Sequence, residues 1–167
     1  MRDILQTKVY ILGSVASGKT TMAKSLSNAL SIPWYELDNI FYKKLPGGDK
    51  RRDSEERDLE FNKIINSETW IIEGVFRECF NEGLDKADTI ILLDVPPLKR
   101  KYRITKRWIF QNLKLEKCNY APTIKMLFRM YKWSKGFEKS RDNILEILKP
   151  YNYKVVILKD NDEQYFY

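Results

Sequence analysis

Hydrophobic residues fall into two kinds of pattern along the chain. Short unbroken apolar runs are typical of strands buried on both faces of a sheet, whereas apolar residues three and four positions apart are typical of helices. Five segments of the first kind are predicted to be strands: 7–12 (TKVYIL), 34–38 (WYELD), 69–74 (TWIIEG), 88–97 (DTIILLDVPP) and 153–160 (YKVVILKD).

The segments between these runs are predicted to be helices and loops. Helices are expected over 18–30, from Ser54 onward with Ser54 as the cap, over 98–112, and over 121–149 with a break at Gly136. The stretch 42–53 (YKKLPGGDKRRD) combines Pro-Gly-Gly with a run of charges and is predicted to be a loop.

Strands that alternate with helices predict an α/β fold in three layers, with a five-stranded parallel sheet covered by helices on both faces. The 167 residues show no internal repeat, low-complexity tract or linker, so a single domain is expected over residues 1–167. No apolar run approaches the roughly 20 residues that span a bilayer. Cys79 and Cys118 lack the CxxC spacing of a metal or redox site. We therefore expect a cytoplasmic protein with two free thiols and no membrane partner.

The first predicted strand leads directly into GSVASGKTT, residues 13–21. Gly13 to Thr20 fit the pattern G-x-x-x-x-G-K-T, the P-loop or Walker A motif, in which backbone N–H groups converge on a phosphate and leave no room for side chains. The helix that begins there adds the positive end of its dipole. A strand before the motif and an amphipathic helix after it are the context that this mechanism requires.

This motif predicts binding of ATP together with Mg²⁺. Lys19 is expected to reach the β- and γ-phosphates, and Thr20 is expected to ligate Mg²⁺. Ala16 stands where related loops usually have Gly, which restricts the conformations open to the loop. The residues expected to contact the nucleotide are Gly13, Ser14, Ala16, Ser17, Gly18, Lys19, Thr20 and Thr21.

The chain has no histidine, so a general base has to be a carboxylate, a lysine, a cysteine or a tyrosine. Asp38 lies at the end of the second predicted strand, and the carboxyl ends of parallel strands are where such sheets bind ligands. We therefore expect Asp38 to act as the general base or to anchor the substrate. The alternative is that Asp38 only caps the next helix.

The segment WIIEGVFRE (70–78) resembles the strand-acidic-Gly-Phe-x-Arg segment of nucleoside monophosphate kinases. The resemblance implies that Glu73 belongs to the Mg²⁺ site beside the substrate, and that Arg77 contacts a substrate phosphate. The family usually has Asp at the first of these positions, so Glu73 is a departure. The alternative is a buried strand that ends in a surface charge.

The segment LLDVPPLKRKYRITKR (92–107) resembles the fourth strand and the lid-entry helix of the same kinases. Arg103 and Arg107 lie nine and thirteen residues after Asp94, on one helical face. The resemblance implies that both arginines are catalytic and clamp the transferring phosphates, where a fixed charge stabilises the transition state. The alternative is a solvated basic helix face. Asp94 is expected to end the strand rather than to bind metal.

Several segments together resemble the small P-loop kinase-like proteins known as DNA topology modulation proteins, which are similar to adenylate, shikimate and gluconate kinases. The shared segments are GSVASGKTT, YELDNIF, WIIEGVFR, ADTIILLDVP and KRKYRITKR, and they cover most of residues 8–107. The resemblance implies a P-loop NTPase fold with a helical lid and ATP binding. In shikimate- and gluconate-kinase-like relatives, an acid at the position of Asp38 meets the substrate hydroxyl.

Positive charge is concentrated in one segment of the chain. Between Lys99 and Arg141, 14 Lys or Arg residues stand against 2 Glu, a local charge of +12 in a chain of net charge +7, so an anionic partner is expected there. Residues 108–136 mix these charges with aromatic side chains. Such a segment forms a helical lid over ATP, packs as core, or binds single-stranded nucleic acid. The basic stretch 43–52 either captures an anionic substrate or is a solvated loop.

These observations predict a kinase-like phosphotransferase that transfers the γ-phosphate of ATP to a small acceptor. Arg77 favours a phosphorylated acceptor such as a nucleoside monophosphate, whereas Asp38 favours a hydroxylated one such as a nucleoside, sugar acid or antibiotic. The alternative is a nucleotide-regulated nucleic-acid-binding protein that affects DNA topology. That alternative predicts steeply salt-dependent binding of DNA or RNA, although no recognised nucleic-acid-binding signature is present.

Overall fold

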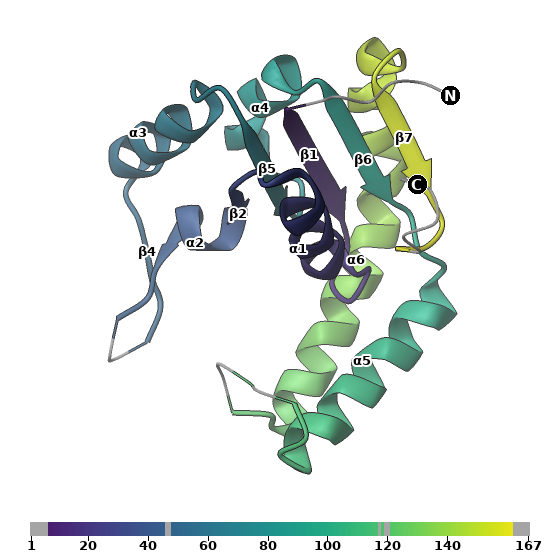
Figure 1. Cartoon of the computed structure of the whole chain (residues 1–167). Coiled ribbons are helices and arrows are strands. Elements are labelled where there is room, and N and C mark those ends of the chain that lie inside the picture. The colour runs from purple at the N-terminus through teal and green to yellow at the C-terminus, as the bar shows by residue number, and fades with distance from the viewer. Residues whose placement is uncertain (1–6, 46–47, 117, 119–120, 162–167) are drawn as a thin grey trace.

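A computed structural model describes residues 7–45, 48–116, 118 and 121–161, and its centre is a five-stranded parallel sheet (Figure 1). The strand order is β2-β5-β1-β6-β7. The strands are β1 (Lys8–Gly13), β2 (Trp34–Glu36), β5 (Trp70–Gly74), β6 (Thr89–Leu93) and β7 (Val155–Leu158). All five predicted strands are therefore present; β1 extends one residue past its predicted end, and the other four are shorter than predicted.

Helices cover both faces of the sheet, as the alternation of elements predicts. In β1, Val9 and Ile11 face α1 (Lys19–Leu30), whereas Tyr10 and Leu12 face the opposite core. That opposite core includes residues of α3 (Ser54–Ile65), α4 (Glu82–Lys86) and α6 (Ile124–Leu148). The sheet is buried on both sides, which explains why its strands are unbroken apolar runs rather than alternating ones.

The strand register brings three chain segments to the same edge of the sheet. Leu12 of β1 lies opposite Gly74 of β5, and Glu36 of β2 lies opposite Glu73 of β5. The loop after β1, the end of β5 and the segment after β2 therefore meet where parallel sheets bind ligands.

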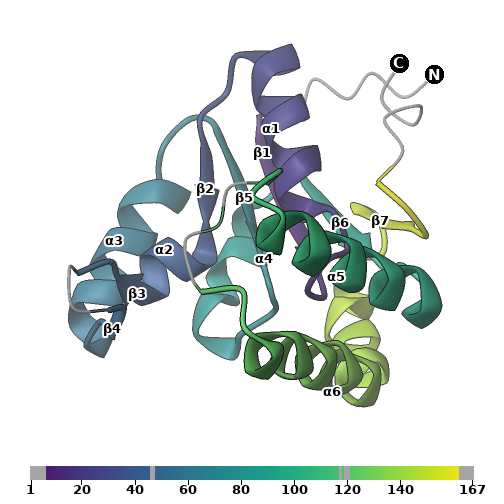
Figure 2. The same ribbon diagram turned by 90° about the horizontal axis from the view of Figure 1, so that it is seen from below.

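Two helices, α5 (Pro97–Asn112) and α6, run side by side and extend past the sheet (Figures 1 and 2). Gly136 does not break α6, contrary to the expectation, because the helix is continuous from Ile124 to Leu148. A single interior glycine weakens a helix by about 1 kcal/mol, which the packing of α6 on α5 and the core outweighs.

The predicted loop 42–53 contains a short antiparallel hairpin, which corrects the sequence-based expectation. Its strands are β3 (Tyr42–Lys43) and β4 (Lys50–Arg51). The expectation that Ser54 caps the next helix is also wrong, because Asp53 is the N-cap and its side chain accepts a 2.8 Å hydrogen bond from the Glu56 N–H. Asp and Ser are nearly equivalent caps, so residue type alone does not decide between these two neighbours.

Three short helices complete the described chain: α2 (Leu37–Phe41) and the 3₁₀ turns η1 (Glu78–Phe80) and η2 (Lys149–Tyr151). Within the described residues, no helix combines the length and the apolar character needed to cross a bilayer.

Candidate phosphate-binding site

The loop between β1 and α1 has the backbone conformation of a phosphate-binding turn. Ala16 and Gly18 both have positive φ, 58° and 95°, the left-handed region that favours glycine. Gly13 is required by space, because a Cβ there would lie 2.8 Å from Ser17 Oγ and 2.9 Å from the Leu93 carbonyl oxygen. The loop therefore curls tightly over the end of the sheet, with Ala16 held in a conformation that is strained for a residue with a side chain.

Lys19 begins α1 and folds back over this loop. Its side chain is 9% exposed, and Nζ donates a 2.7 Å hydrogen bond to the carbonyl oxygen of Ser14. Burial lowers the pKa of Lys19, and the carboxylate of Glu73 opposes that shift. A buried ammonium group beside backbone N–H groups is a strong attraction for an anion.

Two side-chain hydroxyl groups in the loop fit an anionic ligand. Ser14 Oγ and Ser17 Oγ are buried, and neither has a hydrogen-bond partner among the described residues. Buried polar groups without partners are uncommon and call for an explanation. Phosphate oxygens in the loop would supply acceptors for these hydroxyl groups.

Thr20 and Glu73 come together beside the loop. Thr20 Oγ1, in the first turn of α1, donates a 2.6 Å hydrogen bond to Glu73 Oε1 at the end of β5. Glu73 is 5% exposed, so the alternative of a surface charge at this position is wrong. Burial raises the pKa of Glu73, while the charge of Lys19 and the Thr20 hydroxyl oppose the shift. The two residues that the sequence assigns to a metal site are therefore neighbours.

These oxygens suit Mg²⁺ in the way that nucleotide sites hold it. Mg²⁺ prefers oxygen ligands and is usually held by one or two protein groups together with substrate phosphates and water. The described residues contain no group of three or more His, Cys, Asp or Glu side chains that could hold a metal ion by themselves. A metal at Thr20 and Glu73 would accordingly depend on the phosphates as co-ligands.

Asp38 and Arg77 form an ion pair at the neighbouring strand ends. Arg77 Nη2 donates a 2.7 Å hydrogen bond to Asp38 Oδ1, and the Asp38 side chain is 64% exposed. Asp38 lies in the first turn of α2 rather than in a strand, because β2 already ends at Glu36. It does not cap that helix, whose N-cap is Glu36. The alternative of a purely capping role for Asp38 is therefore wrong.

An aromatic ring and a second arginine extend this pair, and neither was predicted from the sequence to be a site residue. The guanidinium carbons of Arg77 and Arg51 lie 4.6 Å and 4.7 Å from the centroid of the Phe41 ring. Arg77 Nη1 is buried and has no hydrogen-bond partner among the described residues. The only sequence signal for Arg51 was its place in the basic stretch 43–52, and the hairpin β3–β4 is what carries it to Phe41.

Arg103 and Arg107 have different surroundings, although both lie on α5. Arg103 Nη1 donates a 3.1 Å hydrogen bond to the carbonyl oxygen of Ser17 in the phosphate loop. Arg107 Nε instead forms an ion pair with Glu116 at 3.3 Å, and both side chains are largely exposed. The structure therefore joins Arg103 to the loop and leaves Arg107 on the surface of the helix pair.

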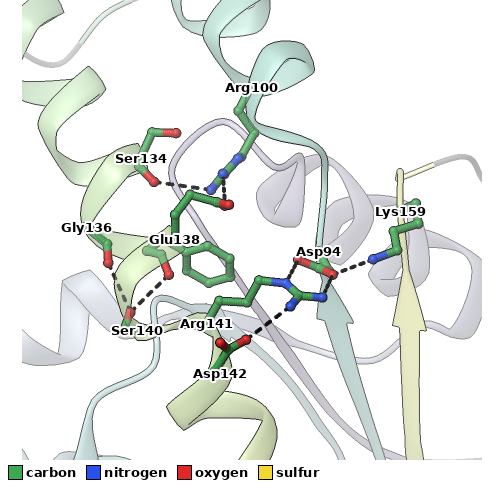
Figure 3. A network of polar contacts seen from close by, with 10 residues as sticks. Asp94, Arg100, Ser134, Gly136, Glu138, Ser140, Arg141, Asp142 and Lys159 are labelled. Carbon is green, nitrogen blue, oxygen red and sulfur yellow. Dashed lines mark hydrogen bonds and ion pairs between the residues drawn. The ribbon is translucent and has the colours of Figure 1, made fainter.

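Asp94, directly after β6, anchors α6 to the sheet (Figure 3). Its carboxylate accepts hydrogen bonds of 2.9 Å and 2.7 Å from Arg141 and one of 2.5 Å from Lys159. Arg100 of α5, which is fully buried, pairs with Glu138 of α6. These contacts tie the α5–α6 pair to the sheet that carries the phosphate loop.

Comparison with known proteins bears on this arrangement at the level of the fold. No model of a protein family and no curated protein matches the sequence. Among solved structures, the chain is similar to shikimate kinase from Acinetobacter baumannii in complex with shikimate, with a TM-score of 0.53, 15% identity, and coverage of 89% of this chain and 81% of that one. The chain has a P-loop kinase fold. The parallel sheet, the loop at the end of β1 and this similarity together support the assignment of the fold.

Two further solved structures agree with the fold. A gluconokinase from Sinorhizobium meliloti 1021 has a TM-score of 0.52 and 13% identity, and the similarity covers 93% of this chain and 83% of the gluconokinase chain. An uncharacterized protein from Eubacterium ventriosum ATCC 27560 has a TM-score of 0.50 and 15% identity, with coverage of 93% and 92%. At such identities the similarity establishes the fold, and function has to be argued from the site itself.

Proposed function

We propose that this protein is an ATP-dependent phosphotransferase that transfers the γ-phosphoryl group of ATP to a small acceptor. The observation that carries the proposal is the contact of Thr20 with Glu73 at the mouth of the phosphate loop, beside the buried ammonium group of Lys19. Phosphoryl transfer needs little covalent chemistry from a protein, because positioning and charge supply most of the catalysis. A hydroxyl, a carboxylate and an ammonium group at one loop meet that need.

The loop residues would bind the nucleotide as the motif predicts. Backbone N–H groups at the start of α1 would bind phosphate oxygens, and Lys19 would leave Ser14 for the β- and γ-phosphates. Thr20 and Glu73 would hold Mg²⁺, Thr20 as a ligand and Glu73 by orienting Thr20 or bound water. Mg²⁺ supplies charge that neutralises the phosphates as they transfer.

The acceptor would lie beside Asp38, between α2 and the end of β5. A carboxylate there can accept the proton of an acceptor hydroxyl or fix its position, and the chain has no histidine to do so. Arg77 and Arg51 would face an anionic group of the acceptor, which fits the buried and unpartnered Nη1 of Arg77 among the described residues. This arrangement accommodates an acceptor that carries both a hydroxyl and an anionic group.

Arg103 and Arg107 would serve the transferring phosphate from α5. Arg103 already touches the phosphate loop, so it needs little movement. Arg107 would have to exchange Glu116 for phosphate, and an exposed ion pair of this kind contributes only about 0–1 kcal/mol. The outer part of the helix pair, at about residues 108–136, would act as the lid that excludes water, with both arginines at its entry. A cytoplasmic location, where ATP is available and cysteines stay reduced, fits this activity.

The proposal is tested by titrating Mg·ATP into the protein and searching for a phosphorylated product by mass spectrometry. The acceptor panel should pair nucleosides with nucleoside monophosphates, and sugar acids with the neutral sugars. Saturable ATP binding and one phosphorylated acceptor class are expected. No ATP binding by a folded protein would contradict the proposal.

A second candidate function rests on the surface of the α5–α6 pair. Tyr102, Phe128 and Trp133 are 65%, 65% and 52% exposed on helices rich in Lys and Arg, the combination that binds single-stranded nucleic acid by stacking and charge. In that case the protein would be a nucleotide-regulated nucleic-acid-binding protein that affects DNA topology. A gel shift with single-stranded DNA should then persist at physiological salt and respond to ATP, and its disappearance at that salt would contradict this candidate.

A further inference from the structure

A carboxylate after the last strand holds the face of α5 that is turned towards the phosphate loop. Asp160 follows β7, and its side chain is 14% exposed. Asp160 Oδ1 accepts a 2.5 Å hydrogen bond from Arg103 Nη2, and Oδ2 accepts one from Lys99. Lys99 and Arg103 are one helical turn apart, so a single carboxylate holds both cations in place.

Arg103 is held from two chain segments at once. One side of its guanidinium group donates to the Ser17 carbonyl oxygen of the phosphate loop at 3.1 Å. The other side donates to Asp160 and, at 2.9 Å, to Asn161 Oδ1. A planar fork with acceptors on both sides has one orientation, whereas an arginine without them samples many rotamers.

The segment after β7 is itself packed against the phosphate loop. Asn161 side-chain atoms lie 2.5 to 2.9 Å from the position that a Cβ would take at Gly18. Gly18 therefore permits this close contact in addition to its positive φ of 95°. The contact fixes Asp160 and Asn161 relative to the start of α1, the helix whose first N–H groups would face the phosphates of a bound nucleotide.

We propose that Asp160 is a positioning residue for nucleotide binding: it acts through Arg103, which it orients at the phosphate loop, and does not itself touch the nucleotide. The inference rests on the proposed function, since it assumes that the loop binds ATP. Removing the carboxylate takes away the one anion that Lys99 and Arg103 share, so that Arg103 keeps only neutral acceptors among those described above, Ser17 O and Asn161 Oδ1, beside the like charge of Lys99. Arg103 is then held less firmly, and part of its ordering has to occur when ATP binds, which weakens binding.

A role of Asp160 in nucleotide binding can be separated from a merely structural role, because other contacts also hold α5 in place. Arg100 pairs with Glu138, and Ile104 is fully buried. The isosteric variant Asp160→Asn should therefore still fold, with a melting temperature lowered by no more than a few degrees, while its Kd for Mg·ATP rises by about tenfold, the equivalent of losing one charge-assisted contact. Lys99→Met removes the other cation but keeps the ion pair between Asp160 and Arg103. This variant should therefore bind ATP as the parent protein does.

The test is calorimetric titration of Mg·ATP into the whole chain and these variants, with Glu146→Gln as a matched control on an exposed ion pair. Arg103→Met should also weaken binding, and adding Asp160→Asn to it should cause no further loss, because both changes remove the same ordered arginine. Should Asp160→Asn not fold, Asp160→Glu, which moves the charge by one methylene, replaces it, and weaker binding is again expected.

The outcomes separate this inference from the function on which it rests. If the parent protein does not bind ATP, or Lys19→Ala binds it equally well, the proposed function fails. If the parent binds ATP and Asp160→Asn binds it equally or more tightly, only the inference fails. The inference also fails if the losses of ATP affinity in Asp160→Asn and Arg103→Met add fully in the double variant. It fails as well if Lys99→Met loses as much ATP affinity as Asp160→Asn does.

Discussion

Thr20 Oγ1 donates a 2.6 Å hydrogen bond to Glu73 Oε1, joining the first turn of α1 to the end of β5. The two residues are 53 positions apart, and the parallel register of β1 with β5 brings them together. An oxygen pair at the start of the phosphate-loop helix is what a site for Mg²⁺ and phosphate requires. The proposed phosphotransferase function depends on this pair.

Replacing Glu73 with Gln should separate metal binding from phosphate binding. The variant keeps a hydrogen-bond acceptor for Thr20 but loses the charge, so the benefit of Mg²⁺ to ATP affinity is expected to fall by about 10- to 100-fold. ATP affinity without Mg²⁺ should stay the same or rise, because a negative charge near the phosphates is gone. Calorimetric titrations of ATP with and without Mg²⁺ check this. An unchanged Mg²⁺ dependence would contradict a metal role for Glu73.

Asp94→Asn should lower stability at neutral pH by about 2 kcal/mol, because Arg141 and Lys159 lose their shared partner. The hydrogen bond and charge of Arg141 lower the pKa of Asp94 from 3.8 to about 2. A lowered pKa means that the contribution is present above pH 3.8 and is lost as the pH falls towards 2. Urea unfolding should therefore show a difference in the free energy of unfolding between the parent protein and Asp94→Asn at pH 7, and this difference should become smaller below pH 4. A gap independent of pH would show that the charge is not its source.

Ala16→Gly should stabilise the protein. Ala16 has a φ of 58°, where a side chain costs roughly 1–2 kcal/mol, and the greater freedom of glycine in the unfolded chain offsets part of the gain. A net gain of about 0.5–1 kcal/mol in the free energy of unfolding is expected. Ala29→Gly, at an exposed position in α1, is the control and should be destabilising by a similar amount. Loss of stability in Ala16→Gly would mean that the loop is not strained.

Arg77→Met should impair use of the acceptor and spare ATP. Arg77 pairs with Asp38 rather than with a residue of the phosphate loop, so the KM for the acceptor is expected to rise by about 10- to 100-fold while ATP affinity changes far less. Arg57→Met, which removes an arginine paired with Asp58 on α3, is the matched control. If Arg77→Met weakens the binding of ATP and of the acceptor to the same extent, Arg77 does not belong to a separate acceptor site.

The parts of this site that could be predicted from the sequence are those encoded locally. Unbroken apolar runs predicted the five strands, and the spacing from Gly13 to Thr20 predicted the phosphate loop between β1 and α1. The resemblance of WIIEGVFRE to nucleoside monophosphate kinases implied that Glu73 shares a metal site with Thr20, and the two residues meet because the ends of β1 and β5 share one edge.

The parts that the sequence could not supply depend on contacts between distant segments. Arg51 reaches Phe41 only through a hairpin whose strands are two residues long, too short for a hydrophobic pattern. Asp160 meets Arg103 because β7 ends beside α5, a relation that no local spacing encodes. The position of Asp38 in a five-residue helix was missed for the same reason, since so short a helix has no periodicity to detect.

The most direct test of the central claim is release of ADP from Mg·ATP by the parent protein and by Lys19→Ala, with each acceptor class supplied in turn. The account predicts that one class of small acceptor stimulates ADP release. Lys19→Ala, shown to be folded by circular dichroism, should then lose at least about 100-fold of that activity. Equal ADP release by the folded Lys19→Ala variant, or stimulation by DNA alone, would contradict it.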